Sequence, residues 1–212
     1  MRFDDVVRRL AVLPEALPAA ATVLIPTIAG SLERRPPWTR PAGSAGRPAG
    51  VLVLLYPDAS GATRVVLTER SSRDGHHSGE VSFPGGKPEP DDVDIVATAL
   101  REAEEEVALD AGAAGLRVVG LLERFWIPVS DYEVTPVLAI ATRRPDLAAA
   151  PAEVARILEP SMAHFMPDAP IEIVERTIGG WPLRYGAYAI DGLSVWGATA
   201  RILSQLGAVL AR

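Results

Sequence analysis

The sequence contains no cysteine among its 212 residues, and this absence removes several kinds of chemistry. Disulfide bonds, thiolate nucleophiles and zinc sites built on cysteine are all excluded. An excess of basic residues is also missing, because the formal net charge is -6 at pH 7. Since the phosphates of nucleic acids attract clustered lysine and arginine, general nucleic-acid binding is disfavoured. A phosphorylated small molecule held through metal ions remains compatible with this charge.

The sequence also lacks a long apolar run. The stretch 17–30 is apolar, but it is short and is interrupted by Pro18 and Pro26, so it cannot span a bilayer. The first ten residues carry Asp4 and Asp5 and have no apolar core of the kind found in secretory signals. We therefore expect a soluble, cytoplasmic protein with no membrane partner.

The length and the hydrophobic content of 48% predict one domain with a sizeable core and an N-terminal arm. Apolar residues at helical spacing near the N-terminus predict a short amphipathic helix. The stretch 36–50 is rich in Pro, Gly, Ala and Arg, which is typical of a linker or of an arm lying on the domain surface. We therefore divide the chain into an N-terminal helix and arm over residues 1–50 and a domain over residues 51–212.

Beyond residue 50, apolar β-branched segments alternate with turn residues. VLVLLY (51–56) and RVVLTER (64–70) are separated by a turn-like segment and predict a hairpin. Further strands are expected in LRVVGLLERF, EVTPVLAIAT, VARILEP, IEIVERTI and RYGAYAID. Helical spacing predicts helices over 93–109 and in the last segment, VWGATARILSQLGAVL. Strands on both sides of one central helix favour an α+β fold with a mixed sheet.

The central helix carries an unusual set of acids. On a helical wheel, its apolar residues form one stripe, and Glu102, Glu105 and Glu106 gather at one edge of that stripe. Glu104 lies on the opposite flank, and Arg101 can pair with Glu105 four residues later. Acids at a helix end are commonly a solvated face, which is the alternative interpretation.

Clustered carboxylates repel one another unless cations offset their charge. Oxygen ligands without His or Cys suit a hard divalent cation, Mg²⁺ or Mn²⁺. The Gly85-Gly86 turn before the helix allows the backbone to approach closely, so a carbonyl at Gly86 is a candidate further ligand. Metals held in this way would bind a substrate's phosphates and activate water.

These residues resemble the signature of the Nudix hydrolases, G-x5-E-x7-R-E-U-x-E-E-x-G-U, where U is aliphatic. Gly86 and the segment REAEEEVAL (101–109) match it. The chain departs from the signature in three ways: one extra residue precedes Arg101, Asp92 stands at the first acid position, and Ala108 stands where glycine is expected. The metal-binding carboxylates are all retained.

The preceding segment, VLTERSSRDGHHSGEVSFPGGKPE, resembles a motif of one branch, the coenzyme A diphosphatases. The matching positions are Thr68, Arg70, Ser71, Gly79, Ser82, Phe83, Pro84, Gly85, Gly86 and Glu89. Glu69 and Gly75 stand where basic residues are expected. The later segments YEVTPVL, AEVARILEPSM and VWGATARIL are also similar, so the resemblance covers roughly residues 51–206.

The resemblance implies an α/β/α sandwich with a mixed sheet and makes residues 51–212 a Nudix hydrolase domain. It implies Mg²⁺- or Mn²⁺-dependent hydrolysis of the diphosphate in coenzyme A or its derivatives, giving adenosine 3′,5′-bisphosphate and 4′-phosphopantetheine. One alternative is another nucleoside diphosphate derivative, such as ADP-ribose or a dinucleotide. Another is a Nudix-fold binding module without catalysis, although such modules usually lose the glutamates retained here.

The resemblance and the wheel together give the candidate site. The metal ligands are expected to be Gly86, Glu102, Glu105 and Glu106. The catalytic residues are expected to be Arg101, Glu105, Glu106 and Glu153. Substrate contacts are assigned to Arg70, Ser71 and Gly85, with Arg73 as a further candidate.

Glu153 is the acid outside the helix that we favour as the base. It follows an alanine-rich stretch, 148–152, that is expected to be flexible, and it precedes an apolar strand. Glu123 and Glu133 are its rivals. His76 and His77 lack the spacing of metal ligands. A homodimer is compatible with the sequence, with the N-terminal arm as one candidate contributor.

Overall fold

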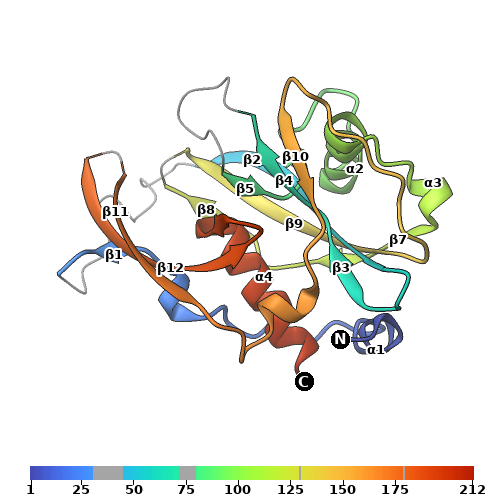
Figure 1. The fold of residues 1–212 in the computed structure, drawn as a ribbon. Helices are drawn as coiled ribbons and strands as arrows, with labels where there is room; N and C mark the ends of the chain where they lie inside the picture. The colour runs from blue at the N-terminus through green and yellow to red at the C-terminus, as the bar shows by residue number, and fades with distance from the viewer. Residues whose placement is uncertain (31–44, 72–79, 129, 179) are drawn as a thin grey trace.

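A mixed six-stranded sheet forms the centre of the fold (Figure 1). The computed structural model describes residues 1–30, 45–71, 80–128, 130–178 and 180–212. The strand order is β3-β2-β9-β7, with β6 also pairing with β2 and β8 with β9. The strands are β2 (Arg47–Pro57), β3 (Thr63–Val65), β6 (Gly85–Gly86), β7 (Leu116–Leu121), β8 (Phe125–Ile127) and β9 (Tyr132–Ala141).

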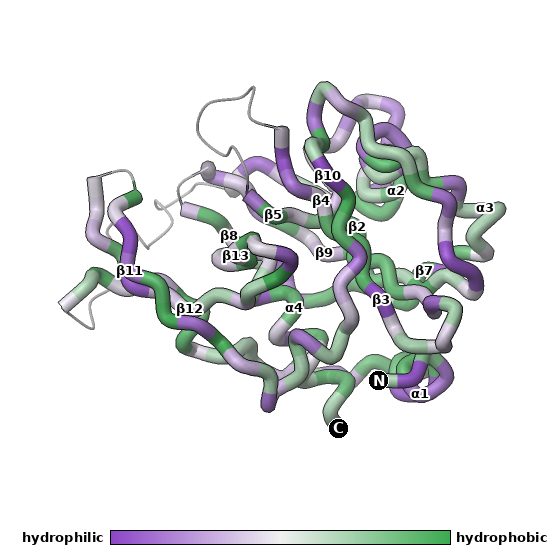
Figure 2. The backbone as a smooth tube through the Cα atoms, in the orientation of Figure 1, coloured by the Kyte–Doolittle hydropathy of each residue, from purple (hydrophilic) through white to green (hydrophobic). Residues whose placement is uncertain are grey.

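The two central strands, β2 and β9, run parallel and are covered on both faces. Strands of this kind carry nearly continuous apolar residues, and LVLLY in β2 fits that pattern. Because successive side chains point to opposite faces, Leu52 and Leu54 pack into one apolar cluster, and Val53 and Leu55 pack into another. The predicted α/β/α arrangement is confirmed, with hydrophobic stretches running through this sheet (Figure 2).

The first face is covered by α2 (Ile95–Val107), the helix predicted from the sequence. Asp94 caps its N-terminus by accepting a hydrogen bond from the Ala97 N–H at 2.8 Å. Ala108 ends it with a positive φ of 53°, a conformation that glycine adopts more readily. These two caps make α2 two residues shorter at each end than expected. The short helix α3 (Ala111–Ala114), which follows it, was not predicted.

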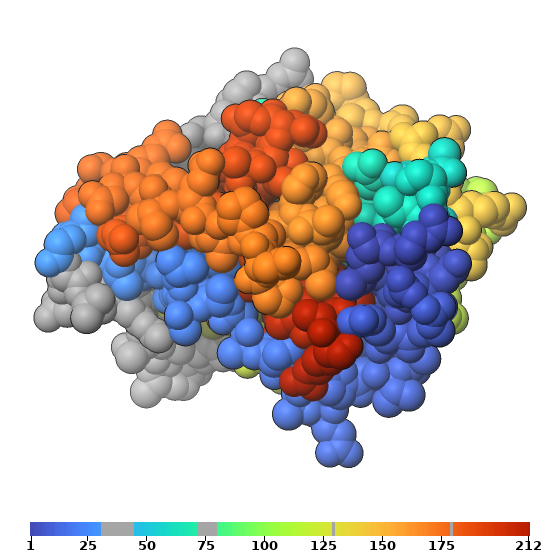
Figure 3. Space-filling model, turned by 60° about the horizontal axis from the view of Figure 1, so that its bottom comes forward, coloured from blue at the N-terminus to red at the C-terminus, as the bar shows by residue number. Residues whose placement is uncertain are grey.

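The second face is covered by α4 (Gly197–Leu210) together with the N-terminal residues. The helix α1 (Phe3–Arg9) and the 3-10 helices η1 (Thr22–Leu24) and η3 (Met162–Phe165) join the same core. The N-terminal segment and the end of α4 lie side by side in Figure 3. β2 already begins at Arg47, whereas the predicted domain boundary at residue 50 stays an expectation. Residues 31–44 of the predicted arm lie outside the described residues.

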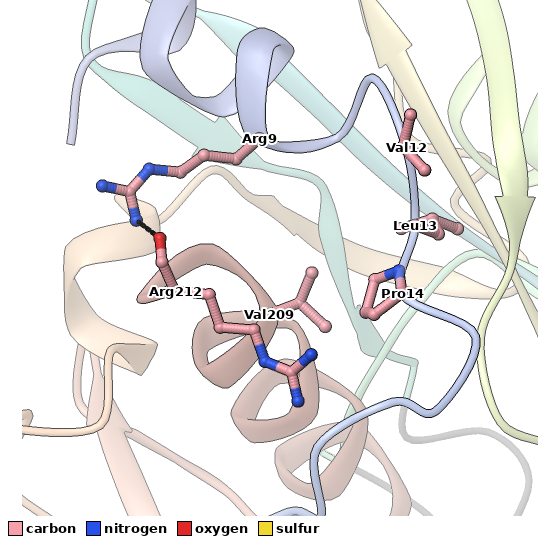
Figure 4. Close-up of a pocket in the computed structure, with 6 residues that line it drawn as sticks. All are labelled: Arg9, Val12, Leu13, Pro14, Val209 and Arg212. Atoms are coloured by element: carbon pink, nitrogen blue, oxygen red, sulfur yellow. Dashed lines mark hydrogen bonds between the residues drawn. The ribbon is translucent and has the colours of Figure 1, made fainter.

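A hollow of about 230 Å³ lies where the N-terminal segment meets the end of α4 (Figure 4). Arg9 crosses this junction and donates from Nη1 to the carbonyl oxygens of Leu210 and Arg212. These bonds satisfy carbonyl groups at the end of α4 that have no partner inside the helix. The hollow is lined by Arg9, Val12, Leu13, Pro14, Val209 and Arg212, none of which was predicted to be functional.

A three-stranded sheet, β10-β4-β5, lies beside α2. Its strands are β4 (Leu67–Arg70), β5 (Val81–Ser82) and β10 (Val154–Leu158). Thr68 of β4 pairs with Ile157 of β10 on one side and with Ser82 of β5 on the other. This sheet therefore places Arg70, just before residues 72–79, beside Val154 at the start of β10, and Val81, just after them, on the other side of β4.

A third sheet extends away from the body, on the left of Figure 1, in the order β1-β12-β11. Its strands are β1 (Thr27–Ile28), β11 (Glu172–Ile178) and β12 (Trp181–Ile190), and β13 (Leu193–Val195) pairs with the end of β12. Asp191 and Gly192 both have positive φ values, 48° and 80°, and form the tight turn into β13. Tyr185 in β12 is buried and stacks on Trp196 with ring centroids 4.7 Å apart.

Among the helices that the structure describes, none is both long and apolar enough to cross a membrane.

Candidate active site

Glu102 and Glu106 lie on the side of α2 that faces the glycine turn. Glu106 is only 5% exposed, and one of its carboxylate oxygens accepts a hydrogen bond from the Gly85 N–H at 3.2 Å. Gly86 lies so close to Glu102 that a Cβ atom there would overlap the Glu102 carboxylate. Gly85 has a φ of 156°, and a Cβ atom there would overlap the backbone of Gly50 and Val51. Gly85 is therefore needed for the turn to pack against β2, whereas a side chain at position 86 would displace the Glu102 carboxylate.

Arg101 holds the acids around it. Its Nε and Nη2 atoms donate to the two carboxylate oxygens of Asp92, each at 3.1 Å. Its Nη1 donates to Glu105 at 2.9 Å, and its Nη2 also donates to Glu102 at 3.2 Å. The Lys87 carbonyl accepts a further bond from Nη2 at 2.9 Å. The expected contact between Arg101 and Glu105 is present, within a wider network.

Asp92, which stands at the first acid position of the signature, is an organising residue that was not among the predicted site residues. Besides the two bonds from Arg101, its carboxylate accepts bonds from the Glu89 N–H and from the Thr98 hydroxyl, at 2.8 and 2.9 Å. The bonds from Arg101 lower the pKa of Asp92 to about 2. Asp92 therefore stays charged and links the loop after the glycine turn to α2.

Burial has the opposite effect on the two inner glutamates. Loss of water around Glu106 raises its pKa to about 7, although the Gly85 N–H and the charge of Arg70 work in the other direction. Burial also raises the pKa of Glu102, against the effect of Arg101. Both carboxylates therefore lack enough positive charge around them to offset their burial.

Glu153 lies close enough to this pair for its charge to raise the pKa of both Glu102 and Glu106. Its backbone carbonyl accepts a bond from the Ser71 N–H at 2.8 Å. The Ser71 hydroxyl donates to the Ala152 carbonyl, also at 2.8 Å. In this structure Ser71 therefore positions the loop that carries Glu153, and a contact between Ser71 and substrate stays a prediction.

The alanine-rich stretch before Glu153, which was expected to be flexible, is attached to the end of α2. The Ala148 N–H donates to the Val107 carbonyl at 3.0 Å, and the Ala150 N–H donates to the Glu106 carbonyl at 2.9 Å. These bonds place the start of β10 at a fixed position beside the carboxylates.

Of the remaining candidates, Arg70 lies near the carboxylates. It is half-buried in β4, and its charge acts on Glu106. Glu123 instead accepts a bond from the Gln205 side chain of α4 at 3.0 Å, and Glu133 lies 3.9 Å from Arg124. Arg73, His76 and His77 lie outside the described residues.

The donor set fits a hard divalent cation. Within the described ranges, no three His, Cys, Asp or Glu side chains are already gathered closely enough to hold a metal ion. Arg101 instead donates hydrogen bonds to oxygens of Glu102 and Glu105. The donors are nevertheless all oxygens, they lie against a turn in which only glycine fits at position 85, and burial raises the pKa of two of them, Glu102 and Glu106.

A second partly buried acid, which sequence reasoning missed, lies at the far end of β2 from the glycine turn. Glu159 accepts a hydrogen bond from the buried Tyr56 hydroxyl and two bonds from Arg144, at 2.7 and 3.2 Å. Burial favours a higher pKa for Glu159, but the bonds from Arg144 and Tyr56 outweigh it, and the pKa is lowered. No signal in the sequence joins these three residues, because they come from distant segments.

The comparisons with known proteins agree with this geometry. Residues 46–163, more than half of the chain, match the family model of the NUDIX domain. Nudix hydrolase 15, mitochondrial, of Arabidopsis thaliana is 37% identical over 167 residues, which cover 76% of this chain and 58% of that protein. The uncharacterized Nudix hydrolase NudL of Photorhabdus laumondii is 33% identical over 176 residues, which cover 81% of this chain and 89% of that protein.

Mitochondrial coenzyme A diphosphatase NUDT8 of Mus musculus is 41% identical over 131 residues, which cover 57% of this chain and 58% of that protein. Among solved structures, the Nudix hydrolase RenU of M. smegmatis has a TM-score of 0.47 and 23% identity, over 56% of this chain and 72% of that chain. The match spans only 58% of the length of the Arabidopsis relative. The domain match and the relatives of similar sequence lead to one conclusion: the chain belongs to the Nudix hydrolase family.

Proposed function

We propose that the protein hydrolyses the diphosphate linkage of coenzyme A or its derivatives, with Mg²⁺ or Mn²⁺, to adenosine 3′,5′-bisphosphate and 4′-phosphopantetheine. The observation that carries the chemistry is a pair of carboxylates, the half-buried Glu102 and the buried Glu106, against a turn in which only glycine fits at position 85. The choice of substrate is supported by the upstream segment VLTERSS…SFPGG and by the 41% identity to the mouse protein named as a coenzyme A diphosphatase.

Glu102, Glu105 and Glu106 would hold the cations, with the Gly86 carbonyl as a further ligand. When bound, the cations would bind the diphosphate and lower the pKa of attacking water. Arg101 is the positioning residue, because its guanidinium contacts Glu102 and Glu105 while Asp92 holds it from the other side. Glu105, the more exposed acid, pairs with Arg101 at 2.9 Å and would turn from it toward the inner pair when the cations bind.

Glu153 would accept the proton that the attacking water loses as its oxygen bonds to phosphorus. The bridging P–O bond then breaks, and the second phosphate leaves with the bridging oxygen. Arg70, which already lies near Glu106, would contact the phosphates and offset their charge. The Gly85 backbone, at the edge of the same turn, is the remaining proposed contact with substrate.

The role of Glu153 is tested by steady-state kinetics of Glu153→Gln. We expect kcat to fall by about 10²-fold with little change in KM, since a base acts in the transition state and not in substrate binding. Glu123→Gln and Glu133→Gln are matched controls, and each should keep near-normal kcat. A normal kcat for Glu153→Gln together with a collapse in one of the controls would move the role of base to that residue.

The substrate is tested by incubating the protein and Mg²⁺ with coenzyme A and with ADP-ribose, and by identifying the products by mass. We expect faster cleavage of coenzyme A. A preference for ADP-ribose would refute the choice of coenzyme A and would favour another nucleoside diphosphate derivative. Cleavage of neither compound, or turnover that persists after thorough chelation of metals, would refute the proposed chemistry. We expect this reaction to take place in the cytoplasm, without a nucleic-acid or membrane partner.

A further inference from the structure

The strand β11 forms the outer edge of the third sheet. All seven of its residues pair with β12 in unbroken register, from Glu172 opposite Ala187 to Ile178 opposite Trp181. On its other side, no strand of the described part of the chain pairs with it. It contains no proline and no bulge, and Figure 1 shows it standing away from the body of the molecule. Such an edge presents N–H and C=O groups that can pair with another strand.

Charges on an edge strand commonly block pairing, and β11 carries Glu172, Glu175 and Arg176, all exposed. Their spacing, however, suits one partner. When an antiparallel pair of identical strands obeys a two-fold axis perpendicular to the sheet, residues on the same face lie opposite each other. With Val174 opposite its own copy, Glu172 lies opposite Arg176, and Arg176 lies opposite Glu172.

The neighbouring registers lack this complementarity. Centring the pair on Glu175 or on Arg176 would place two like charges directly opposite each other, which is destabilising. Centring it on Ile173 would pair no opposite charges. The register centred on Val174 therefore gives two opposite-charge pairs and avoids like charges.

The same register also joins apolar surfaces. Val174 lies on the face of the sheet that carries the small apolar cluster of Leu183, Tyr185 and Ala187, and it packs against that cluster. On the opposite face, Ile173 is 45% exposed, and pairing would cover part of it. Val174 opposite its copy would connect the two clusters across the axis, and cross-strand apolar contacts of this kind add to those of the charge pairs.

We infer that β11 is the site of self-association, where a second copy of this chain pairs antiparallel about Val174 and extends the sheet through both copies. This assembly does not depend on the proposed hydrolysis, because the proposed metal-binding carboxylates lie on α2 and Glu153 lies just before β10, and none of them is on this sheet. The occupant of the edge is the protein itself, selected by the crossed pairs between Glu172 and Arg176.

The test is sedimentation velocity of two charge-reversal variants, Glu172→Arg and Arg176→Glu, each alone and then mixed. Each variant alone places like charges at both pair positions, and we expect its dimer dissociation constant to rise by about tenfold or more. In the mixture, the Arg introduced at position 172 of one variant faces the Glu introduced at position 176 of the other. The native Arg176 of the first variant faces the native Glu172 of the second. We therefore expect a one-to-one heterodimer with nearly wild-type affinity.

Glu175→Arg is the matched control, since Glu175 faces Ile173 in this register and pairs with Arg184 within its own chain, at 3.4 Å. Its dissociation constant should stay close to that of the wild type. A wild-type protein that remains monomeric up to its solubility limit would overturn the proposal and leave the edge to a strand of another protein. A dimer that none of the reversals weakens, or a mixture of the two variants that does not recover, would also overturn it. Circular dichroism of each variant confirms that it is folded before its dissociation constant is compared.

Discussion

Two glutamates near opposite ends of β2, the buried Glu106 and the half-buried Glu159, differ in how their charge is accommodated. Glu159 is surrounded by donors, with the Tyr56 hydroxyl and both arms of Arg144 on its carboxylate, and its pKa is lowered. Glu106 is more deeply buried but accepts one backbone hydrogen bond, and its pKa rises to about 7. The protein therefore satisfies one acid internally and leaves the other with too little countercharge.

The difference indicates what each acid is for. An acid that is fully paired within the chain stabilises the fold, since removing it leaves its donors without partners. An acid that is buried with too little countercharge costs stability, and this cost is recovered only when a cation binds. A perturbed carboxylate next to other acids is thus the better marker of the functional site.

The largest expected effect comes from Glu106→Gln, which keeps the size of the side chain but removes its charge. Because the charge would hold the cations, we expect kcat to fall by about 10²-fold or more, as for other groups that stabilise transition-state charge. Glu104→Gln, on the exposed flank of the same helix, is the matched control and should leave kcat nearly unchanged. Equal losses in both variants would contradict the assignment of Glu106.

The second effect concerns pH and the metal-free protein. A carboxyl whose pKa is raised on folding, here from 4.5 to about 7, binds its proton more tightly in the folded state. Burying the Glu106 carboxyl therefore costs least stability below pH 4.5. This cost in the free energy of unfolding grows as pH rises toward 7, and it is constant at higher pH. We expect Glu106→Gln to be more stable than the wild type above pH 7 by on the order of 2 kcal/mol, and this difference should vanish near pH 4.

Chemical denaturation of both proteins in chelator, across this pH range, measures the difference. Saturating Mg²⁺ should reduce it above pH 7, since the metal binds the folded wild type. A difference that is independent of pH would mean that Glu106 is not the group that titrates.

A third, smaller effect is expected at the other acid. Glu159→Ala leaves the buried Tyr56 hydroxyl without its acceptor and should lower the free energy of unfolding by about 2 kcal/mol, with kcat nearly unchanged. The double variant with Tyr56→Phe removes both partners and should lose less than the sum of the single changes. A loss of kcat without a loss of stability would break the distinction between the two acids.

The smallest effect is expected at Ala108, which ends α2 with a φ of 53°. Ala108→Gly removes the strain of that conformation and should raise the free energy of unfolding by about 1 kcal/mol. Thermal and chemical unfolding measure the gain, and kcat should not change, because Ala108 contacts neither acid. A change in kcat would show that the rate follows the stability of α2 and not the charge of Glu106.

The sequence predicted the parts of the fold that repeat a local pattern. The apolar stripe of α2 is confirmed, with Ala99, Ala103 and Val107 buried, and the long strands β2, β9 and β12 lie where their apolar residues indicated. The wheel also separated Glu106, which is buried, from the exposed Glu104. Local periodicity contains this information because burial follows the geometry of the element.

What the sequence could not predict depends on contacts between distant segments. The Ser71 hydroxyl bonds to Ala152, and Tyr56 meets Glu159, in pairs that no spacing rule links. The rotation of Glu102 and Glu105 toward Arg101 is also a matter of side-chain geometry, which a helical wheel does not include. The two-residue strand β1 is too short to give a pattern and exists because β12 offers it a partner.

The parallel pairing of β2 with β9 has a consequence for the order of folding. Parallel strands that are far apart in sequence pair only after a long loop has closed, and such contacts form late. Until then, α2 lacks the complete sheet on which it packs, and Glu106 is hydrated like any other glutamate. The electrostatic cost of the site therefore arises only when α2 docks on β2, and a divalent cation that binds at this stage would stabilise the docked helix and slow its release.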